Sequence, residues 1–181
     1  MRSTTTRTAL LVALSLVTAA AASCAQVEAD IPEAQVTQKG VTFHGAGRGD
    51  GRGEVSVTQS FTLSSDNLSW VKDLNSKIYI TEIELSAASG VTDLSFIHFA
   101  HVTMDDADKM TMPVVIVDYV RPDNMAPTSV LTAKTPYPID VSKVWTAKKV
   151  LVTVTVAGDL PHKPWTVDVI LHLSGKISYK L

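Results

Sequence analysis

The stretch that decides the fold is WTVDVILHLSGKISYKL, residues Trp165–Leu181. Its apolar residues keep one parity for most of its length, while polar residues fill most of the other parity. A period of two places alternate side chains on opposite faces of a β-strand. The pattern therefore predicts a half-buried strand, with Ile170 as the exception on the outer parity. The residues predicted to face the core are Trp165, Val167, Val169, Leu171 and Leu173.

The same alternation recurs upstream, in Val55–Leu63 and in Val150–Val156. A third stretch begins with apolar residues at even positions, Ile78 and Ile80, and continues with Ile83 and Leu85 at odd positions. A change of phase by one residue is what a β-bulge produces. The sequence therefore predicts a bulge near residues 81–82.

Two further strands are predicted, over Leu94–Val102 and Pro113–Val120. The second contains Val-Val-Ile-Val at 114–117, which is apolar on both parities and predicts a central strand covered on both faces. Val130-Leu131 is predicted as a short edge strand within a proline-punctuated connection. Unequal strands and irregular connections favour an all-β fold, a two-layer antiparallel β-sandwich of six to eight strands, Ig-like or jelly-roll-like, over a barrel.

The segment before these strands has a different composition. It begins acidic and alanine-rich after Gln26 and ends with five glycines between Gly45 and Gly53. Glycine loses more backbone entropy on folding than any other residue. The composition predicts a flexible tether over residues 24–53, with Val41–Phe43 as a short strand or an anchor patch within it, and a sandwich domain over residues 54–181.

The first 23 residues have the features of a secretory signal peptide. Arg2 and Arg7 make a cationic start, Thr8–Ala22 is apolar and uncharged, and small residues precede Cys24. The apolar run is too short to span a bilayer comfortably as a helix. We therefore expect residues 1–23 to be removed and to take no part in the fold.

The end of this leader, Ala21-Ala22-Ser23-Cys24, resembles the lipobox of bacterial lipoproteins, although Ala21 stands where that family usually has leucine. The resemblance implies that Cys24, the only cysteine of the chain, is lipidated with acyl chains such as palmitate. Two or more such chains give stable membrane anchoring. The resemblance to Gram-negative lipoproteins also implies outer-membrane delivery, because Ala25 rather than aspartate follows the cysteine. Ordinary signal-peptidase cleavage is the alternative and would give a periplasmic or secreted protein.

Charge and composition narrow the classes of partner. The chain has 16 Lys and Arg against 18 Asp and Glu, a formal net charge of −2 at pH 7. No basic stretch with interleaved aromatic residues marks a nucleic-acid surface, so no nucleic-acid partner is expected. Membrane contact is expected only through the N-terminal lipid.

The candidate metal ligands are Asp105, Asp106 and Asp108, in a turn that supplies the oxygen ligands that calcium prefers. The EF-hand spacing is absent, and a solvated turn is the alternative. His98 and His101 are three residues apart and so point to opposite faces of a strand, which argues against a shared zinc ion. His172 lies on the polar parity of its strand.

The sequence contains no Gly-x-Ser-x-Gly motif, and its one cysteine ends the leader. We therefore expect a non-enzyme without a cofactor. The leading expectation is an envelope module that binds another envelope protein or a polysaccharide, or has a structural role there. The alternatives are a small lipoprotein subunit of a secretion or surface-appendage assembly, and a hydrolase with a diffuse site. Convergence of His98, His172 and Asp168 with the 105–108 aspartates would favour the hydrolase.

Overall fold

The computed structural model describes residues 26–45, 55–64, 75–108, 112–145 and 149–180. The predicted signal peptide and the predicted lipidation of Cys24 concern residues that lie outside these ranges. The described segments form eight strands and one short helix. In chain order they are β1 (Gln26–Phe43), β2 (Val55–Ser64), β3 (Asn75–Ser89), β4 (Ile97–Asp106), β5 (Val114–Val120), β6 (Val130–Asp140), α1 (Ser142–Trp145), β7 (Lys149–Gly158) and β8 (Trp165–Lys180).

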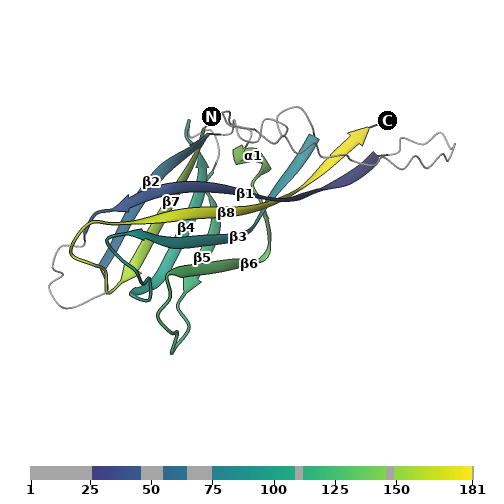
Figure 1. The fold of residues 1–181 in the computed structure, drawn as a ribbon. Helices are drawn as coiled ribbons and strands as arrows, with labels where there is room; N and C mark the ends of the chain where they lie inside the picture. The colour runs from purple at the N-terminus through teal and green to yellow at the C-terminus, as the bar shows by residue number, and fades with distance from the viewer. Residues whose placement is uncertain (1–25, 46–54, 65–74, 109–111, 146–148, 181) are drawn as a thin grey trace, which may run out of the picture.

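The strands form two packed four-stranded sheets (Figure 1). Sheet A has the order β1-β8-β3-β6 and sheet B has the order β2-β7-β4-β5, and all pairs are antiparallel. Eight strands in these two orders make a jelly roll. The predicted all-β sandwich is confirmed, and of the two expected forms it is the jelly roll rather than the immunoglobulin arrangement.

The core lies between the sheets and follows the predicted parities. Trp165 and Val169 are each 1% exposed, and the other odd-numbered residues of β8 through Leu173 are also buried. Val150, Val152, Val154 and Val156 of β7 meet them from sheet B and are fully buried. Apolar burial at these positions is the main stabilising contribution to the fold.

The predicted bulge in β3 is confirmed. Against β8, the partners change from Ile80 with Leu173 to Glu82 with His172, which leaves Thr81 as the extra residue. The register of β3 against β6 also shifts at this point. The shift keeps Ile80 and Ile83 both in the core. It also turns Glu82 to the outer face of sheet A, where it lies opposite His172.

The prediction of a flexible tether is wrong for Gln26–Phe43, which forms β1 along the whole length of β8. Val36, Val41 and Phe43 enter the core, and the ring of Phe43 stacks on Trp165 with centroids 4.5 Å apart. Register shifts between residues 31 and 34 and between residues 38 and 41 interrupt the alternation. Because bulges break the period of two, the alternation typical of a strand could not be recognised in this part of the sequence. Residues 46–53 lie outside the described structure.

The prediction that the 113–120 strand is central is also wrong, because β5 is an edge strand of sheet B. Val115 and Val120 are 46% and 64% exposed, whereas Ile116 and Val117 are buried. The register against β4 skips Ile116. A bulge there directs two adjacent side chains to the core, which explains an apolar run on both parities without cover on both faces.

The second half of the chain holds two elements that differ from expectation. Strand β6 is an edge strand as predicted, but it extends to Asp140 through Pro136 and Pro138. Proline is tolerated at such an edge because it has no N–H to donate to a ladder. Helix α1 was not predicted, and it buries Val144 and Trp145 against the core. No helix in the described segments is long and apolar enough to cross a membrane.

Candidate functional site

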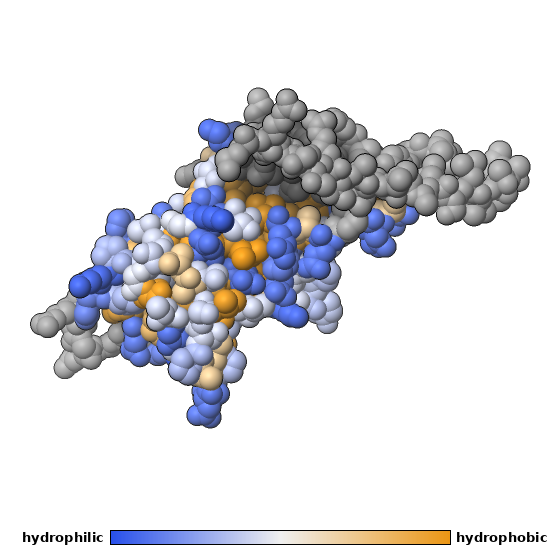
Figure 2. Space-filling model, viewed as in Figure 1, coloured by the Kyte–Doolittle hydropathy of each residue, from blue (hydrophilic) through white to orange (hydrophobic). Residues whose placement is uncertain are grey.

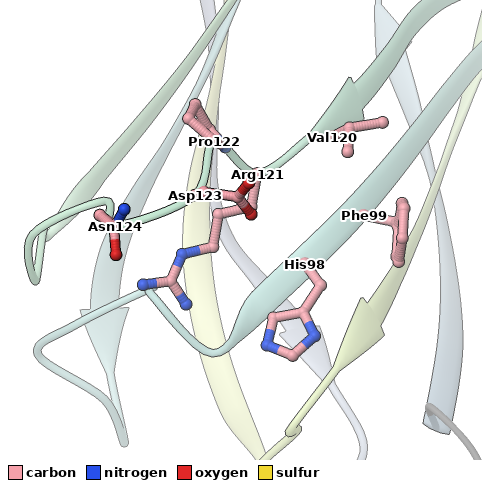
Figure 3. A pocket seen from close by; sticks show the side chains of 7 residues that line it. All are labelled: His98, Phe99, Val120, Arg121, Pro122, Asp123 and Asn124. Carbon is pink, nitrogen blue, oxygen red and sulfur yellow. The ribbon is translucent and has the colours of Figure 1, made fainter.

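A groove of about 360 Å³ lies where β4 begins and β5 ends, at one end of sheet B (Figure 3). It combines an aromatic ring, an aliphatic side chain and several polar groups. Its lining residues are His98, Phe99, Val120, Arg121, Pro122, Asp123 and Asn124.

A bulge at the start of β4 shapes one wall of the groove. Ile97 lies opposite Gly158, and Phe99 lies opposite Ala157, so His98 is the extra residue. Gly158 has φ 149°, and a Cβ built on it would lie 2.1 Å from the carbonyl oxygen of Phe96. Only glycine fits here, because the two backbones approach too closely for a side chain. The bulge presents His98 to the groove, with its Nε2 3.5 Å from the Asp159 carboxylate.

The turn after β5 forms the other wall. The Arg121 amide donates to the His98 carbonyl at 2.8 Å, which ties this turn to β4. The Arg121 guanidinium donates to the Met125 carbonyl at 2.9 Å and to the Ser95 carbonyl. Asn124 occupies the left-handed region, with φ 61°, which asparagine tolerates better than most residues. The guanidinium therefore joins two loops and fixes the shape of the groove.

A carboxylate holds the neighbouring loop in place. Asp93 accepts hydrogen bonds from the Ser95 hydroxyl at 2.5 Å, the Ser95 amide at 2.8 Å and the Thr128 amide at 2.9 Å. These hydrogen bonds hold the pKa of the Asp93 carboxyl below its usual range, and the bond from the Ser95 hydroxyl has the largest effect. At neutral pH the carboxylate is charged, and its hydrogen bonds hold in place the loop around Ser95, whose carbonyl accepts a hydrogen bond from Arg121.

The outer face of sheet B continues the groove as a row of polar side chains. Phe99 is 42% exposed and lies opposite Val120. Next to this pair, His101 Nδ1 lies 2.5 Å from Asp118 Oδ1. In register with His101, the hydroxyls of Thr155 and Thr58 are 2.9 Å apart. An exposed ring therefore borders a strip of hydrogen-bonding groups.

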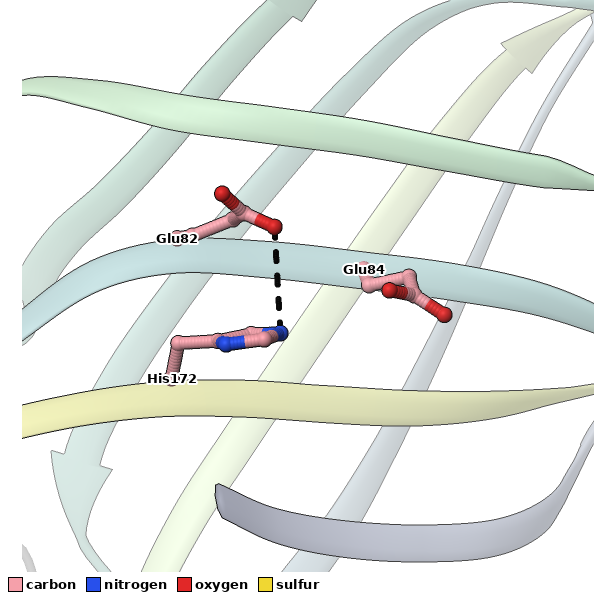
Figure 4. A group of neighbouring side chains, drawn as sticks. All are labelled: Glu82, Glu84 and His172. Carbon is pink, nitrogen blue, oxygen red and sulfur yellow. Dashed lines mark ion pairs between the residues drawn. The ribbon is translucent and has the colours of Figure 1, made fainter. Parts of the chain in front are cut away.

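A second cluster lies on the outer face of sheet A (Figure 4). Glu82, Glu84 and His172 each offer one ligand atom within 4.8 Å of the others. His172 Nδ1 is 3.2 Å from Glu33 Oε1, and its Nε2 is 3.7 Å from Glu82 Oε1. The Lys134 ammonium lies 3.6 Å from Glu82 Oε2. Viewed from this side, the surface is largely hydrophilic, with smaller apolar areas (Figure 2).

Two of the three predicted calcium ligands, Asp105 and Asp106, accept hydrogen bonds from the backbone of their own turn. Asp105 Oδ1 accepts the Asp106 amide, and Asp106 Oδ1 accepts the Asp108 amide, both at 2.8 Å. Among the described residues, these three aspartates do not bring three carboxylate oxygens within 4.8 Å of one another. The geometry is that of a self-capped turn.

The groups that would mark a hydrolase lie apart. His98 is on β4 of sheet B, whereas His172 and Asp168 are on β8 of sheet A. Asp168 Oδ1 accepts the Gly40 amide at 2.8 Å. His101 pairs with Asp118, and His98 lies near Asp159, so the two histidines serve different partners.

Phe99, Glu82 and Glu84 were missed as site residues. The two glutamates are two positions apart in a strand, which places them on one face. Their meeting with His172 depends on the pairing of β3 with β8, which no local pattern encodes. The exposure of Phe99 depends on the bulge at His98, which keeps Ile97 and Ala100 in the core and places Phe99 on the outer face of sheet B.

No family model and no curated protein matches the sequence. The solved structures that resemble it include a decameric BFDV capsid protein (TM-score 0.38, 12% identity, covering 84% of this chain and 99% of that chain). A structure of Cocksfoot mottle virus has a TM-score of 0.36 and 12% identity, and the match covers 98% of this chain and 97% of that chain. A family 32 carbohydrate-binding module from C. perfringens NanJ, in complex with galactose, has a TM-score of 0.26 and 11% identity. That match covers 78% of this chain and 99% of that chain. With every score below 0.5, what these proteins bind or assemble into is not carried over to this chain.

Proposed function

We propose that this protein is a binding module that holds a polysaccharide across the outer face of sheet B, at the groove around Phe99. The observation that carries the proposal is the exposed Phe99 ring beside the groove. A sugar ring presents an apolar face of C–H groups and a rim of hydroxyls. An aromatic side chain supplies rigid apolar contact to the first, and polar side chains supply hydrogen bonds to the second.

The polar groups around Phe99 suit a hydroxyl-rich ligand. Asp123 and Asn124 line the groove on the β5 side, and His98 lines it on the β4 side. The strip with His101, Thr155 and Thr58 crosses the sheet from strand to strand. An extended chain of sugar units laid along this strip would meet one strand after another.

The proposal is tested by Phe99→Ala. We expect the wild-type protein to bind one or more envelope polysaccharides. The variant should lose about fivefold to tenfold in affinity, since a ring contact of this kind contributes roughly 1–1.4 kcal/mol. Affinity electrophoresis or calorimetry measures the change. Tyr137→Ala is the matched control, because Tyr137 is an aromatic side chain that is 80% exposed on β6 of the other sheet. Equal affinity for the wild type and Phe99→Ala would refute the site.

We further propose that the module is exported and held at the outer membrane by a lipid on Cys24. The signal-like leader and the small residues before the cysteine support this location. Strand β1 begins at Gln26, opposite Lys180, at the end of the sandwich away from the Phe43–Trp165 pair (Figure 1). The groove lies toward the other end, where Gly158 lies opposite Ile97. A lipid at Cys24 would leave the groove facing away from the membrane.

The location is tested by Cys24→Ser in a Gram-negative host. We expect the wild-type protein in the outer-membrane fraction with added acyl mass, and the variant released from membranes, because the lipid is the only expected anchor. Fractionation and intact-mass measurement give both results. A wild-type product without acyl mass in the periplasm would show plain secretion instead.

A second candidate function is that of a subunit in an envelope assembly. Strand β5 pairs only with β4 within the described segments, so its other edge is open. Val115 is exposed on this strand, and Met112, just before it, is 88% exposed. An open strand edge with apolar side chains can accept a strand from a partner. Specific co-assembly that is lost with Val115→Lys and retained with Phe99→Ala would favour this function.

A further inference from the structure

We propose that Glu82, Glu84 and His172 bind a divalent transition-metal ion of the zinc class on the outer face of sheet A. The ligand set is one imidazole nitrogen and two carboxylate oxygens, which is a set that zinc accepts. The site is separate from the groove of sheet B, and it does not depend on the function proposed for that groove.

The strand register creates the ligand set. Glu82 lies directly opposite His172 in the β3–β8 pair. Glu84 follows two residues later on the same face. The extra residue Thr81 sets this phase, because without it Glu82 and Glu84 would share the parity of Ile78 and Ile80, which are buried in the core. The bulge therefore brings both carboxylates to the imidazole.

The orientation of His172 is that of a metal ligand. Its Nδ1 lies 3.2 Å from Glu33 Oε1, which fixes the ring from the β1 side. Its Nε2 is buried and has no hydrogen-bond partner within the described structure. The Glu82 carboxylate is 3.7 Å from this nitrogen, too far for a hydrogen bond. A carboxylate on one ring nitrogen with a metal on the other is a recurrent arrangement of metal sites.

The distances are close to those of a bound ion. The three ligand atoms lie within 4.8 Å of one another. Ligand atoms at about 2.0–2.2 Å from a tetrahedral ion are roughly 3.3–3.6 Å apart, so side-chain shifts of about 1 Å would complete the site. Figure 4 shows Glu82 and the His172 ring directed toward one another across the β3–β8 pair, with Glu84 next along β3.

The charges also favour a cation. Glu33, Glu82 and Glu84 surround one half-buried imidazole, and Lys134 approaches only the far oxygen of Glu82. A divalent ion would compensate two of the carboxylates. The competing arrangement is a protonated His172 that itself serves as the cation between Glu33 and Glu82.

The experiment is a titration of the metal-free protein with Zn²⁺ by calorimetry and with Co²⁺ by visible absorption. We expect one ion per chain, a Co²⁺ spectrum typical of low coordination number and a higher melting temperature with Zn²⁺. His172→Ala and Glu84→Gln should each weaken binding at least tenfold. His101→Ala is the control for metal binding, because His101 pairs with Asp118 on the other sheet. Its affinity for Zn²⁺ and Co²⁺ should equal that of the wild type.

The readouts separate the possible outcomes. Absence of Zn²⁺ and Co²⁺ binding at millimolar concentration would overturn the proposal in favour of the protonated histidine. Binding that survives in folded His172→Ala, or that is lost with His101→Ala, would overturn it in favour of a different site. Circular dichroism of each variant shows whether it has folded, and Glu84→Gln is the gentler change if His172→Ala has not. Polysaccharide binding at Phe99 is measured independently.

Discussion

A variant that begins at Glu54 is expected not to fold, whereas one that begins at Gln26 is expected to be as stable as the full chain without its leader. The shorter variant loses Val36, Val41 and Phe43 from the core. Removal of one buried phenylalanine and two buried valines costs about 6–10 kcal/mol, against a total stability of about 5–15 kcal/mol. It also leaves the long strand β8 without its neighbour on one side.

Circular dichroism and the emission of the tryptophans report the outcome. Trp165 is buried between Phe43 and Phe96, so its emission should move to longer wavelength when β1 is absent. Phe43→Ala in the longer variant serves as a graded comparison, with an expected loss of about 3–5 kcal/mol. A cooperative unfolding transition of undiminished midpoint in the Glu54 variant would show that β1 is dispensable.

Val169→Asp should also unfold the domain. Val169 is 1% exposed in the middle of β8, which pairs with strands on both sides. An unpaired carboxylate at such a position costs several kilocalories per mole, a large part of the total stability. Urea denaturation followed by circular dichroism measures the loss.

The matched control is Thr37→Asp, the same new side chain at an exposed position of the neighbouring strand β1. Its free energy of unfolding should change by about 0.5 kcal/mol or less, as is usual for surface substitutions. Similar losses in the two variants would mean that the two faces of sheet A are not distinguished by burial, contrary to the described structure.

Much of the fold was predictable because β2, β7 and most of β8 alternate regularly between buried and more exposed side chains. The parity of β8 and β7 identified core residues such as Val169 and Val154, and the phase change in β3 identified the bulge at Thr81. The failures occurred where bulges change the period. Two register shifts interrupt the alternation in β1, so this strand was not predicted. One shift at Ile116 makes the edge strand β5 apolar on both parities, as a central strand would be.

The candidate sites were less predictable, because they depend on pairing between distant strands. Glu82 and His172 are 90 positions apart in the sequence and become neighbours only through the register of β3 and β8. Phe99 lies within an apolar stretch that predicts a core strand, and its exposure comes from the change of parity at the His98 bulge. The aspartates at 105–108 had the stronger local signal, yet two of their carboxylates serve their own turn.

The adjacency of β1 and β8 has a consequence for the order in which the molecule acquires its structure. Within the described segments, the first strand pairs only with the last, so Gln26 meets Lys180 across nearly the whole chain. Closing such a loop costs chain entropy before its contacts can offset that cost, and folds rich in such contacts form slowly. Sheet A therefore cannot be completed until β8 has been synthesised. The hydrophobic face of β1, which is synthesised first, must wait for β8, the last of the described strands to be made.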